Sequence, residues 1–175
     1  MLETKISDNE HDIYDLAVKA GQSLVQRGWM LVTAESCTGG WVGQAVTAVS
    51  GSSAWYERGY ITYSNTAKCE MLGVQQVTLD HYGAVSPQTA QEMAIGALNH
   101  SHAQISVSIT GIAGPDGGTA AKPVGMVCFA WTTQDGLVQQ ETHYFSGDRE
   151  SIRRQAVATA LQGVLTMLSH AVTIA

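Results

Sequence analysis

The first part of the chain carries a helical pattern of apolar positions. Its predicted buried face consists of Ile13, Leu16, Ala20 and Leu24, which recur at steps of three or four residues. This spacing places side chains on one face of an α-helix. Ser7 followed by Glu10 is a capping-box pattern. The sequence therefore predicts a long amphipathic helix that begins at Ser7 and ends at Gly28.

Four more helices are predicted from a start signal that precedes apolar residues at the same spacing. Ser64, Ser86 and Asp148 are favourable N-cap residues, and Pro87 suits the first helical turn. The remaining helix follows the glycine pair at residues 39–40. The predicted helices cover residues 41–50, 65–72, 87–98 and 149–168.

Short apolar runs between these helices predict five strands, at residues 29–34, 59–63, 104–110, 124–131 and 137–145. The last two strands flank Asp135-Gly136, a hairpin turn signal, and are expected to pair antiparallel. Because the earlier strands alternate with helices, they are expected to be parallel. The sequence thus predicts an α/β fold, a three-layer α/β/α arrangement with a mixed, partly parallel sheet, as a single domain over residues 1–175.

Composition and charge exclude several classes of protein. With 45% hydrophobic and 14% charged residues, the chain can bury a sizeable core and is not a disordered polypeptide. Nine Lys and Arg against fifteen Asp and Glu give a formal net charge of −6. Without a basic cluster, nucleic acid is not an expected partner.

No membrane or export signal is expected either. Residues 36–56 and 155–175 are uncharged, but the first stretch is rich in Gly and Ser and the second is interrupted by polar residues at amphipathic spacing. Residues 1–10 lack the apolar stretch of a signal peptide. Three cysteines at long spacings indicate reduced thiols, so we expect a cytoplasmic protein.

Candidate chemistry gathers where predicted strands end, the usual ligand position in open α/β sheets. Residues 33–40 (TAESCTGG) place Ser36, Cys37 and Thr38 on a turn whose backbone N–H groups can hold an anion or oxyanion. Residues 110–118 (TGIAGPDGG) form a glycine-rich loop that lets backbone approach a ligand. Lys122 can add positive charge beside it.

Ser36 needs a base to become a nucleophile, and lysine is the better candidate. The six histidines fall in predicted helices, helix ends or an edge strand, away from the strand ends. Lys68 lies one turn inside the helix that follows the second strand. Burial lowers the pKa of a lysine, so a neutral amine becomes available. Tyr63, at the end of that strand, can relay or orient the proton.

Each of these features also has a purely structural interpretation. Ser36 and Thr38 can be ordinary helix caps, Lys68 a solvated surface lysine, and the glycine run a surface loop. Cys37 at a helix start is an alternative nucleophile. His100 and His102 are a weak candidate for a metal site, because two imidazoles without nearby carboxylates or thiols make an incomplete ligand set.

Seven blocks in order along the chain resemble the CinA C-terminal domain family. They are residues 33–40 (TAESCTGG), 51–56 (GSSAWY), 63–68 (YSNxxK), 83–86 (GAVS), 110–118 (TGIAGPDGG), 123–125 (PVG) and 145–149 (FxGDR). The blocks cover nearly the whole chain and together are very specific. The likeness is greatest to members that consist of this domain alone and act as nicotinamide-nucleotide amidases.

The resemblance implies roles for individual residues. The family's serine nucleophile falls on Ser36, its lysine base on Lys68, its assisting tyrosine on Tyr63 and its loop threonine on Thr110. Its arginine falls on Arg149, with Arg153 one turn further on as a second possibility. The full set of expected substrate-binding residues is Cys37, Thr38, Gly39, Gly40, Thr110, Gly111, Gly114, Arg149 and Arg153.

The resemblance also implies an activity, the hydrolysis of the carboxamide of nicotinamide mononucleotide to nicotinic acid mononucleotide and ammonia in NAD salvage. Neither a metal nor an organic cofactor is expected, and activity of the N-terminal domain found in longer family members is not expected. The alternative is an inactive nucleotide-binding or regulatory module with the same loops. Trp55 and Tyr56, expected at the surface, and the uncharged last helix favour a homodimer or larger homo-oligomer.

Overall fold

The computed structural model describes the backbone of residues 3–170 and the side chains of residues 12–170. Its elements follow in the order α1 (Glu3–Arg27), β1 (Leu31–Glu35), α2 (Trp41–Thr47), the short 3-10 helix η1 (Ser52–Ala54), β2 (Tyr56–Ile61), α3 (Asn65–Leu72), α4 (Gln76–Tyr82), α5 (Pro87–Asn99), β3 (Ile105–Gly111), β4 (Met126–Thr133), β5 (Val138–Tyr144) and α6 (Arg149–His170).

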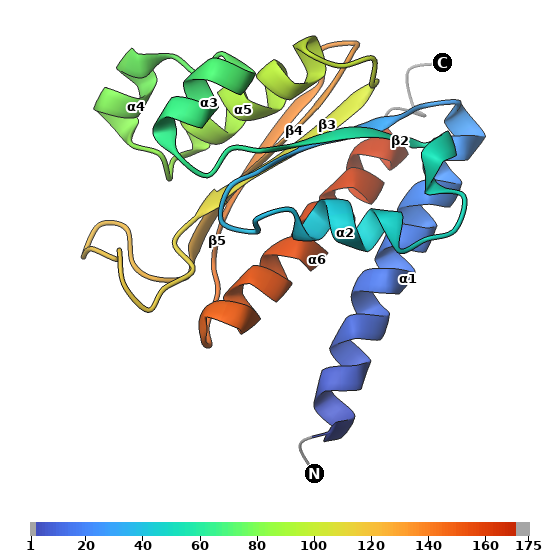
Figure 1. Cartoon of the computed structure of the whole chain (residues 1–175), viewed down its shortest axis with the longest axis horizontal. Coiled ribbons are helices and arrows are strands. Elements are labelled where there is room, and N and C mark those ends of the chain that lie inside the picture. The colour runs from blue at the N-terminus through green and yellow to red at the C-terminus, as the bar shows by residue number, and fades with distance from the viewer. Residues whose placement is uncertain (1–2, 171–175) are drawn as a thin grey trace.

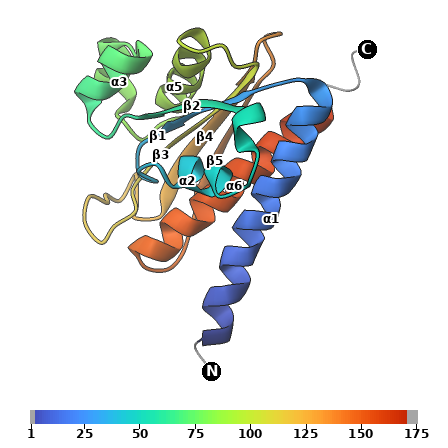
Figure 2. The ribbon, with the colours of Figure 1, turned by 45° about the vertical axis from the view of Figure 1, so that its right-hand side comes forward.

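The five strands form one mixed sheet in the order β2-β1-β3-β4-β5. β1 pairs in parallel with β2 and β3, whereas β4 pairs antiparallel with β3 and β5. Figure 1 shows α1, α2 and α6 on one face of the sheet and α3, α4 and α5 on the other. Figure 2 shows the sheet between the two helical layers. The predicted three-layer α/β/α fold and the antiparallel final hairpin are confirmed.

Alternate residues of β3 face the two helical layers on opposite sides of the sheet. One face of the strand contributes Ile105, Val107 and Ile109 to the apolar core shared with α1, α2 and α6. On the other face, Ser106 Oγ donates to the Ala94 carbonyl (2.7 Å) and Ser108 Oγ to the Ala90 carbonyl (2.5 Å) of α5. The small side chains let α5 pack closely, and their hydroxyl groups are satisfied although they are buried.

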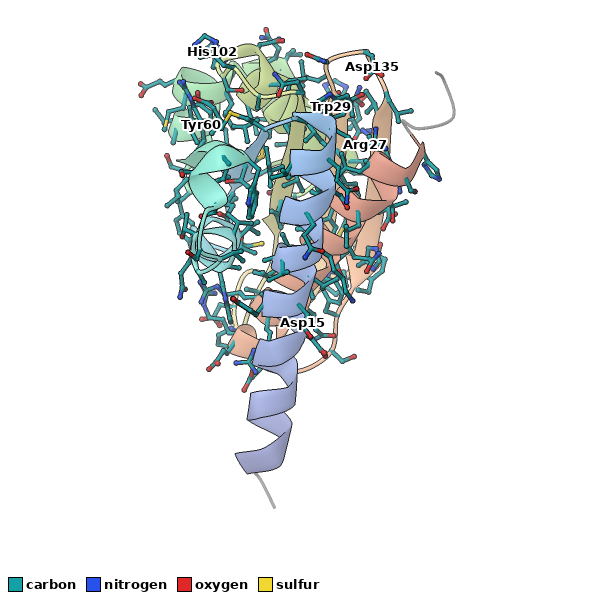
Figure 3. All side chains as sticks on the ribbon, turned by 90° about the vertical axis from the view of Figure 1, so that its right-hand side faces the viewer. Asp15, Arg27, Trp29, Tyr60, His102 and Asp135 are labelled. Atoms are coloured by element: carbon teal, nitrogen blue, oxygen red, sulfur yellow. The ribbon has the colours of Figure 1, made fainter. Side chains whose placement is uncertain are left out.

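A polar contact and apolar packing join α1 to α6. The Arg27 guanidinium lies over the Trp29 ring, 5.7 Å from its centroid, and donates to the Leu168 carbonyl at the far end of α6. Figure 3 shows Arg27 and Trp29 where α1 ends.

Among residues 3–170, no helix has both the length and the apolar character needed to cross a bilayer.

Three predicted helix starts are confirmed. Ser64 Oγ accepts from Ala67 N (3.1 Å) at the start of α3, and Ser86 Oγ accepts from Thr89 N (3.1 Å) at the start of α5. The Asp148 carboxylate accepts from the backbone N–H of the third residue of α6 at 2.8 Å. These side chains satisfy N–H groups that have no partner within the helix.

The predicted start of the first helix is wrong. α1 begins at Glu3, four residues before Ser7. Ser7 and Glu10 therefore lie inside the helix rather than at its N-terminus. A capping-box pattern permits a helix to begin but does not prevent it from beginning earlier. The short helix α4 was not predicted, because its seven residues (QVTLDHY) include few apolar positions.

Two expectations around β2 are also wrong. The strand begins at Tyr56, before the predicted residue 59, and ends at Ile61, so Tyr63 lies beyond it. Trp55 is not a surface residue: only 3% of it is exposed. Its indole packs against Gly21 of α1, where the absence of a side chain leaves room for the ring. Tyr56 is half-buried, and its hydroxyl forms a hydrogen bond with Thr33 Oγ1 at 2.9 Å.

Candidate active site

The candidate site lies at the carboxyl ends of the three parallel strands. Glu35, the last residue of β1, is in register with Ile61 of β2 and Ile109 of β3. The next residues along each strand, Ser36, Thr62 and Thr110, therefore come side by side. Because β2 and β3 lie on opposite sides of β1, and α2 and α5 cover opposite faces, this is the topological switch point of the sheet (Figure 1).

Ser36 and Lys68 are in direct contact. Lys68 lies one turn inside α3, and its Nζ donates to Ser36 Oγ at 3.0 Å and to the Thr62 carbonyl at 2.8 Å. Only 1% of Lys68 and 8% of Ser36 are exposed. The interpretation of Lys68 as a solvated surface lysine is therefore wrong.

Burial lowers the pKa of Lys68 below its ordinary value of 10.5, because the charged ammonium loses its hydration. No salt bridge among the described residues includes Lys68. A neutral amine at this position can donate to the Thr62 carbonyl and accept a hydrogen bond from the Ser36 hydroxyl. In that protonation state the pair has the geometry needed for removal of the serine proton.

Cys37, next to Ser36 in the sequence, has a thiol whose pKa is raised rather than lowered. Only 7% of Cys37 is exposed, and burial raises its pKa to about 12. A thiol, not a thiolate, is thus the stable form near neutral pH, and a thiol is a poor nucleophile. The geometry favours Ser36 over Cys37 as the attacking group.

The turn between β1 and α2 requires two glycines. Gly39 and Gly40 both have positive φ, +61° and +98°, and a Cβ on Gly40 would lie 2.8 Å from Ile61 Cδ1. Gly39 N donates to the Ser36 carbonyl at 3.0 Å. Within the described part of the chain, the N–H groups of Thr38 and Gly40 donate to no backbone acceptor. They are available to stabilise an oxyanion beside Ser36.

A buried carboxylate that was not considered among the site residues holds the start of α2. Glu35, 1% exposed, accepts from Val42 N (2.9 Å) and Gly43 N (3.0 Å). It replaces the side-chain cap that Gly40 does not supply. Glu35 contacts backbone N–H groups seven and eight residues further along the chain. No sequence motif identifies a side chain that makes such contacts.

The two arginines of α6 make different contacts. Arg149 is exposed and bridges the mouth of the site: Nη1 donates to the Gly114 carbonyl (2.7 Å) and Nη2 to the Tyr63 hydroxyl (3.2 Å). Arg153 donates to the carbonyl groups of the turn itself, from Nε to Cys37 and from Nη2 to Thr38, both at 3.0 Å.

Tyr63 lies at the rim rather than in the depth of the site. It is 65% exposed, and among the described residues no hydrogen bond joins it to Ser36 or Lys68. Thr110 is buried, and its Oγ1 donates to the Ala84 carbonyl at 2.7 Å. Lys122 donates to the Tyr82 carbonyl and does not line the cavity around Ser36.

Two adjoining hollows define the space available to a ligand. The first has a volume of about 270 Å³ and is lined by Ser36, Cys37, Tyr63, Asn65, Lys68, Ala84, Val85, Thr110, Gly111, Ala113 and Arg149. The second, about 660 Å³ and more open, is lined by Thr38, Gly39, Gly40, Trp41, Gln44, Arg149, Glu150 and Arg153. Arg149 belongs to both, so a ligand can extend from Ser36 past this arginine.

The structure thus brings most of the predicted site residues around these two hollows. Gly114 contributes its carbonyl to Arg149 and lines neither hollow. In the described residues, no group of three or more His, Cys, Asp or Glu side chains is arranged to hold a metal ion. His100 Nδ1 instead contacts the Gly96 carbonyl of its own helix at 2.7 Å.

These features define an α/β domain with a buried serine–lysine pair at the switch point of a mixed sheet. The chain belongs to the CinA C-terminal domain family, whose family model matches residues 13–168. It is 50% identical over 157 residues to a protein of Enterobacter agglomerans named nicotinamide-nucleotide amidohydrolase PncC, covering 90% of this chain and 96% of that protein.

Two further comparisons agree. A protein of the same name from Escherichia coli K12 is 53% identical over 153 residues, which is 87% of this chain and 93% of the relative. The crystal structure of a competence/damage inducible protein from Agrobacterium tumefaciens superimposes with a TM-score of 0.87 at 47% identity, covering 90% of this chain and 96% of that chain.

Proposed function

We propose that this chain is a nicotinamide-nucleotide amidohydrolase that uses Ser36 and Lys68. The observation that carries the proposal is the buried Lys68 amine, 3.0 Å from Ser36 Oγ and paired with no carboxylate of the described residues. Relatives at about 50% identity bear the name of this activity. Their name supplies the substrate class, a nicotinamide nucleotide, and the site supplies the chemistry. Within that class we propose nicotinamide mononucleotide, the substrate that the family resemblance implies.

The first half of the reaction forms an acyl-enzyme. Ser36 Oγ attacks the carboxamide carbon as its proton passes to Lys68 Nζ, and backbone N–H groups of the 36–40 turn hold the oxyanion. The Lys68 ammonium then gives this proton to the departing amide nitrogen. The C–N bond breaks, ammonia leaves, and Ser36 carries the nicotinate ester.

The second half restores the enzyme. A water molecule enters where ammonia left, gives a proton to Lys68 and attacks the ester carbon. The Ser36–carbon bond breaks and the proton returns to Ser36 Oγ. The product is nicotinic acid mononucleotide, and no metal or organic cofactor takes part.

The shape of the site suggests how the substrate lies. The pyridine ring and carboxamide would occupy the 270 Å³ cavity around Ser36. The ribose and phosphate would extend past Arg149 into the larger groove. A guanidinium can pair with phosphate oxygens in a bidentate geometry. We therefore assign phosphate or ribose binding to Arg149, with Tyr63 as its partner at the rim.

The wider setting is part of the same proposal. We propose one amidase domain over residues 1–175, acting in NAD salvage in the cytoplasm as a homodimer or larger homo-oligomer, without nucleic acid or membrane as partner. The burial of Trp55 removes one argument for self-association. Light scattering of the purified protein tests the oligomeric state directly.

The decisive experiment is ammonia release from nicotinamide mononucleotide, with free nicotinamide as the substrate control. Release from the nucleotide is expected from the wild-type protein. Ser36→Ala is expected to lower kcat at least about 10³-fold while substrate binding is retained, because the nucleophile alone is lost. Ser53→Ala, at an exposed serine of η1, is the matched control and is expected to keep its rate.

Two outcomes would contradict this assignment. Near-normal turnover of Ser36→Ala together with loss in Cys37→Ala would assign the attack to the thiol. Binding of the nucleotide without ammonia release from the wild-type protein would indicate a nucleotide-binding or regulatory module instead.

A further inference from the structure

Arg153 lines the larger hollow, but two of its donor atoms are bonded to the protein. Its Nε and Nη2 each donate to a carbonyl of the 36–40 turn, and its guanidinium lies 5.3 Å from the centroid of the Trp41 ring. The planar fork of arginine can reach two adjacent carbonyl groups at once, which a lysine ammonium cannot do with the same rigidity. The side chain is half-buried between α6 and the turn.

These contacts fix the orientation of two consecutive peptide units. The peptide bonds here are trans, so each C=O points opposite to the N–H of the same unit. Since the Cys37 carbonyl faces Arg153, the Thr38 N–H points away from α6. Since the Thr38 carbonyl also faces Arg153, the Gly39 N–H points away too, and it closes the turn on the Ser36 carbonyl at 3.0 Å.

The Thr38 N–H is therefore held in one direction with no protein acceptor among the described residues. A charged donor on the Cys37 carbonyl also polarises that peptide unit, which makes its N–H a stronger donor. After the turn, the N–H groups of Val42 and Gly43 in α2 are held by Glu35. Two side chains, Arg153 and Glu35, thus hold the backbone in and just after the turn before any substrate arrives.

We infer that Arg153 is a positioning residue: by binding the carbonyl groups of Cys37 and Thr38, it pre-orients the backbone N–H of Thr38, which stabilises the oxyanion formed at Ser36. This role differs from the substrate binding expected from the sequence. It rests on the proposed amidase function and adds to it a residue that acts through the backbone. Arg149, which is exposed and lines both hollows, remains the arginine that we assign to the substrate.

Kinetics of matched variants separate the two roles. Arg153→Met keeps an apolar stem over Trp41 but removes both hydrogen bonds to the turn, and Arg153→Lys keeps the charge on a flexible ammonium in place of the planar fork. Loss of an oxyanion donor typically lowers kcat about 10²- to 10³-fold, so Arg153→Met is expected to lower kcat by about 10²-fold with little change in KM. Arg153→Lys is expected to recover part of this loss.

The control is Arg154→Met. Arg154 follows Arg153 on the same helix, lies 5.8 Å from the centroid of the same Trp41 ring and pairs with Glu150, but it makes no hydrogen bond to the turn. Its variant is expected to keep kcat. A raised KM with unchanged kcat in Arg153→Met would overturn the inference, because it is the result expected of a phosphate-binding residue.

A second readout does not depend on the proposed substrate. Pyridine-3-boronic acid can accept Ser36 Oγ at boron, with the serine proton passing to Lys68, to give a tetrahedral anion that resembles the oxyanion intermediate. Its affinity is expected to fall in Arg153→Met in proportion to kcat and to stay unchanged in Arg154→Met. Equal affinity in the wild-type protein and Arg153→Met would overturn the inference.

The boronate also separates this inference from the proposed function. A wild-type protein that releases no ammonia but binds the boronate more tightly than Arg153→Met refutes the proposed substrate and supports the role of Arg153. A wild-type protein that releases ammonia with the same kcat as Arg153→Met refutes the role of Arg153 and leaves the proposed function standing.

Discussion

Lys68 combines two properties that are costly to combine: its amine is buried, and no carboxylate of the described residues pairs with it. Burial disfavours the ammonium, so the amine loses its proton at a lower pH than a lysine in water, and its pKa is lowered. The Thr62 carbonyl satisfies one N–H in either protonation state. The residue thus gives up stability in order to provide a base at Ser36.

The pH dependence of activity should show this base. Below the pKa of Lys68 in the folded protein, the ammonium cannot accept the Ser36 proton. We therefore expect kcat/KM for nicotinamide mononucleotide to rise with pH and level off at an inflection below the ordinary lysine pKa of 10.5. A value of kcat/KM that falls as the pH rises from about 6 to about 9 would contradict this assignment, because the fraction of neutral amine can only increase over that range.

The lowered pKa of Lys68 should also make the free energy of unfolding depend on pH. Between the lowered pKa in the folded state and the ordinary pKa in the unfolded state, the unfolded chain binds more protons at residue 68. The free energy of unfolding of the wild-type protein should therefore rise with pH relative to Lys68→Met, by at most about 1.4 kcal/mol per pH unit. Urea unfolding of both proteins across this range measures the difference, because all other titrating groups are common to the two.

At the residue scale, the sequence predicted those contacts that follow from strand topology. Ser36 and Lys68 were placed together because each follows the carboxyl end of a parallel strand. The contacts of Arg153 and Glu35 could not be predicted, because both side chains bind backbone atoms. The direction of a peptide unit depends on the folded turn and has no pattern in the sequence. The prediction that Trp55 is exposed is wrong. The sequence does not show that Gly21 of α1, which has no side chain, leaves room for the indole ring.

At the scale of single elements, α2 is a seven-residue helix that needs help from elsewhere in the chain. Gly40 supplies the φ of +98° that the turn requires but has no side chain to cap the helix. Glu35 provides the missing acceptor for two N–H groups. The strand β1, the turn and the helix are therefore joined through one buried carboxylate.

Replacing this carboxylate should affect both stability and rate. Glu35→Gln retains one acceptor but places an NH₂ group against a backbone N–H, so we expect the free energy of unfolding to fall by about 2 kcal/mol. We also expect kcat to fall, because the backbone that follows the oxyanion turn loses part of its support. Urea unfolding and ammonia release measure the two effects.

Glu92 offers a matched control. Its half-buried carboxylate accepts from Gln75 N (2.8 Å) and Thr78 Oγ1 (2.5 Å) at the start of α4, remote from the turn. Glu92→Gln should lower stability, by about 1 kcal/mol, and leave kcat unchanged. An equal loss of kcat in both variants would show that the effect of Glu35→Gln is not specific to the turn.

Helix starts show how far local signals determine elements. Ser64, Ser86 and Asp148 were predicted correctly because each is a favourable N-cap residue placed just before a helical segment. The prediction that the first helix begins at Ser7 is wrong, because no helix-breaking residue directly precedes Ser7 and α1 begins at Glu3. The helix α4 escaped prediction, since its buried positions are Thr78 and Leu79 and the element depends on α5 and Glu92 for support.

At the scale of the whole molecule, the site is assembled from both helical layers. Lys68 comes from α3 on one face of the sheet, and Arg153 comes from α6 on the other. Ser36 lies between them at the end of the central parallel strands. The distance between Lys68 and Ser36 therefore depends on how closely α3 and α5 pack on the sheet, well away from the reacting atoms.

Two glycines allow this dependence to be tested. A Cβ at Gly96 of α5 would lie 1.8 Å from the carbonyl oxygen of Leu72, the last residue of α3, and a Cβ at Gly21 of α1 would lie 2.6 Å from the Trp55 ring. Both Gly96→Ala and Gly21→Ala overpack a helix contact, and each should lower the free energy of unfolding by about 2 kcal/mol. Urea unfolding measures this common cost.

Their effects on turnover should differ. Leu72 is one turn from Lys68, so Gly96→Ala should displace the base and lower kcat. Trp55 precedes β2, and its carbonyl accepts from Leu31 N at the opposite end of β1 from Ser36. Gly21→Ala should therefore lose stability without losing kcat in the folded protein. If both variants lost kcat equally, the rate would follow overall stability, and the packing of α3 on α5 would have no particular part in holding Lys68 against Ser36.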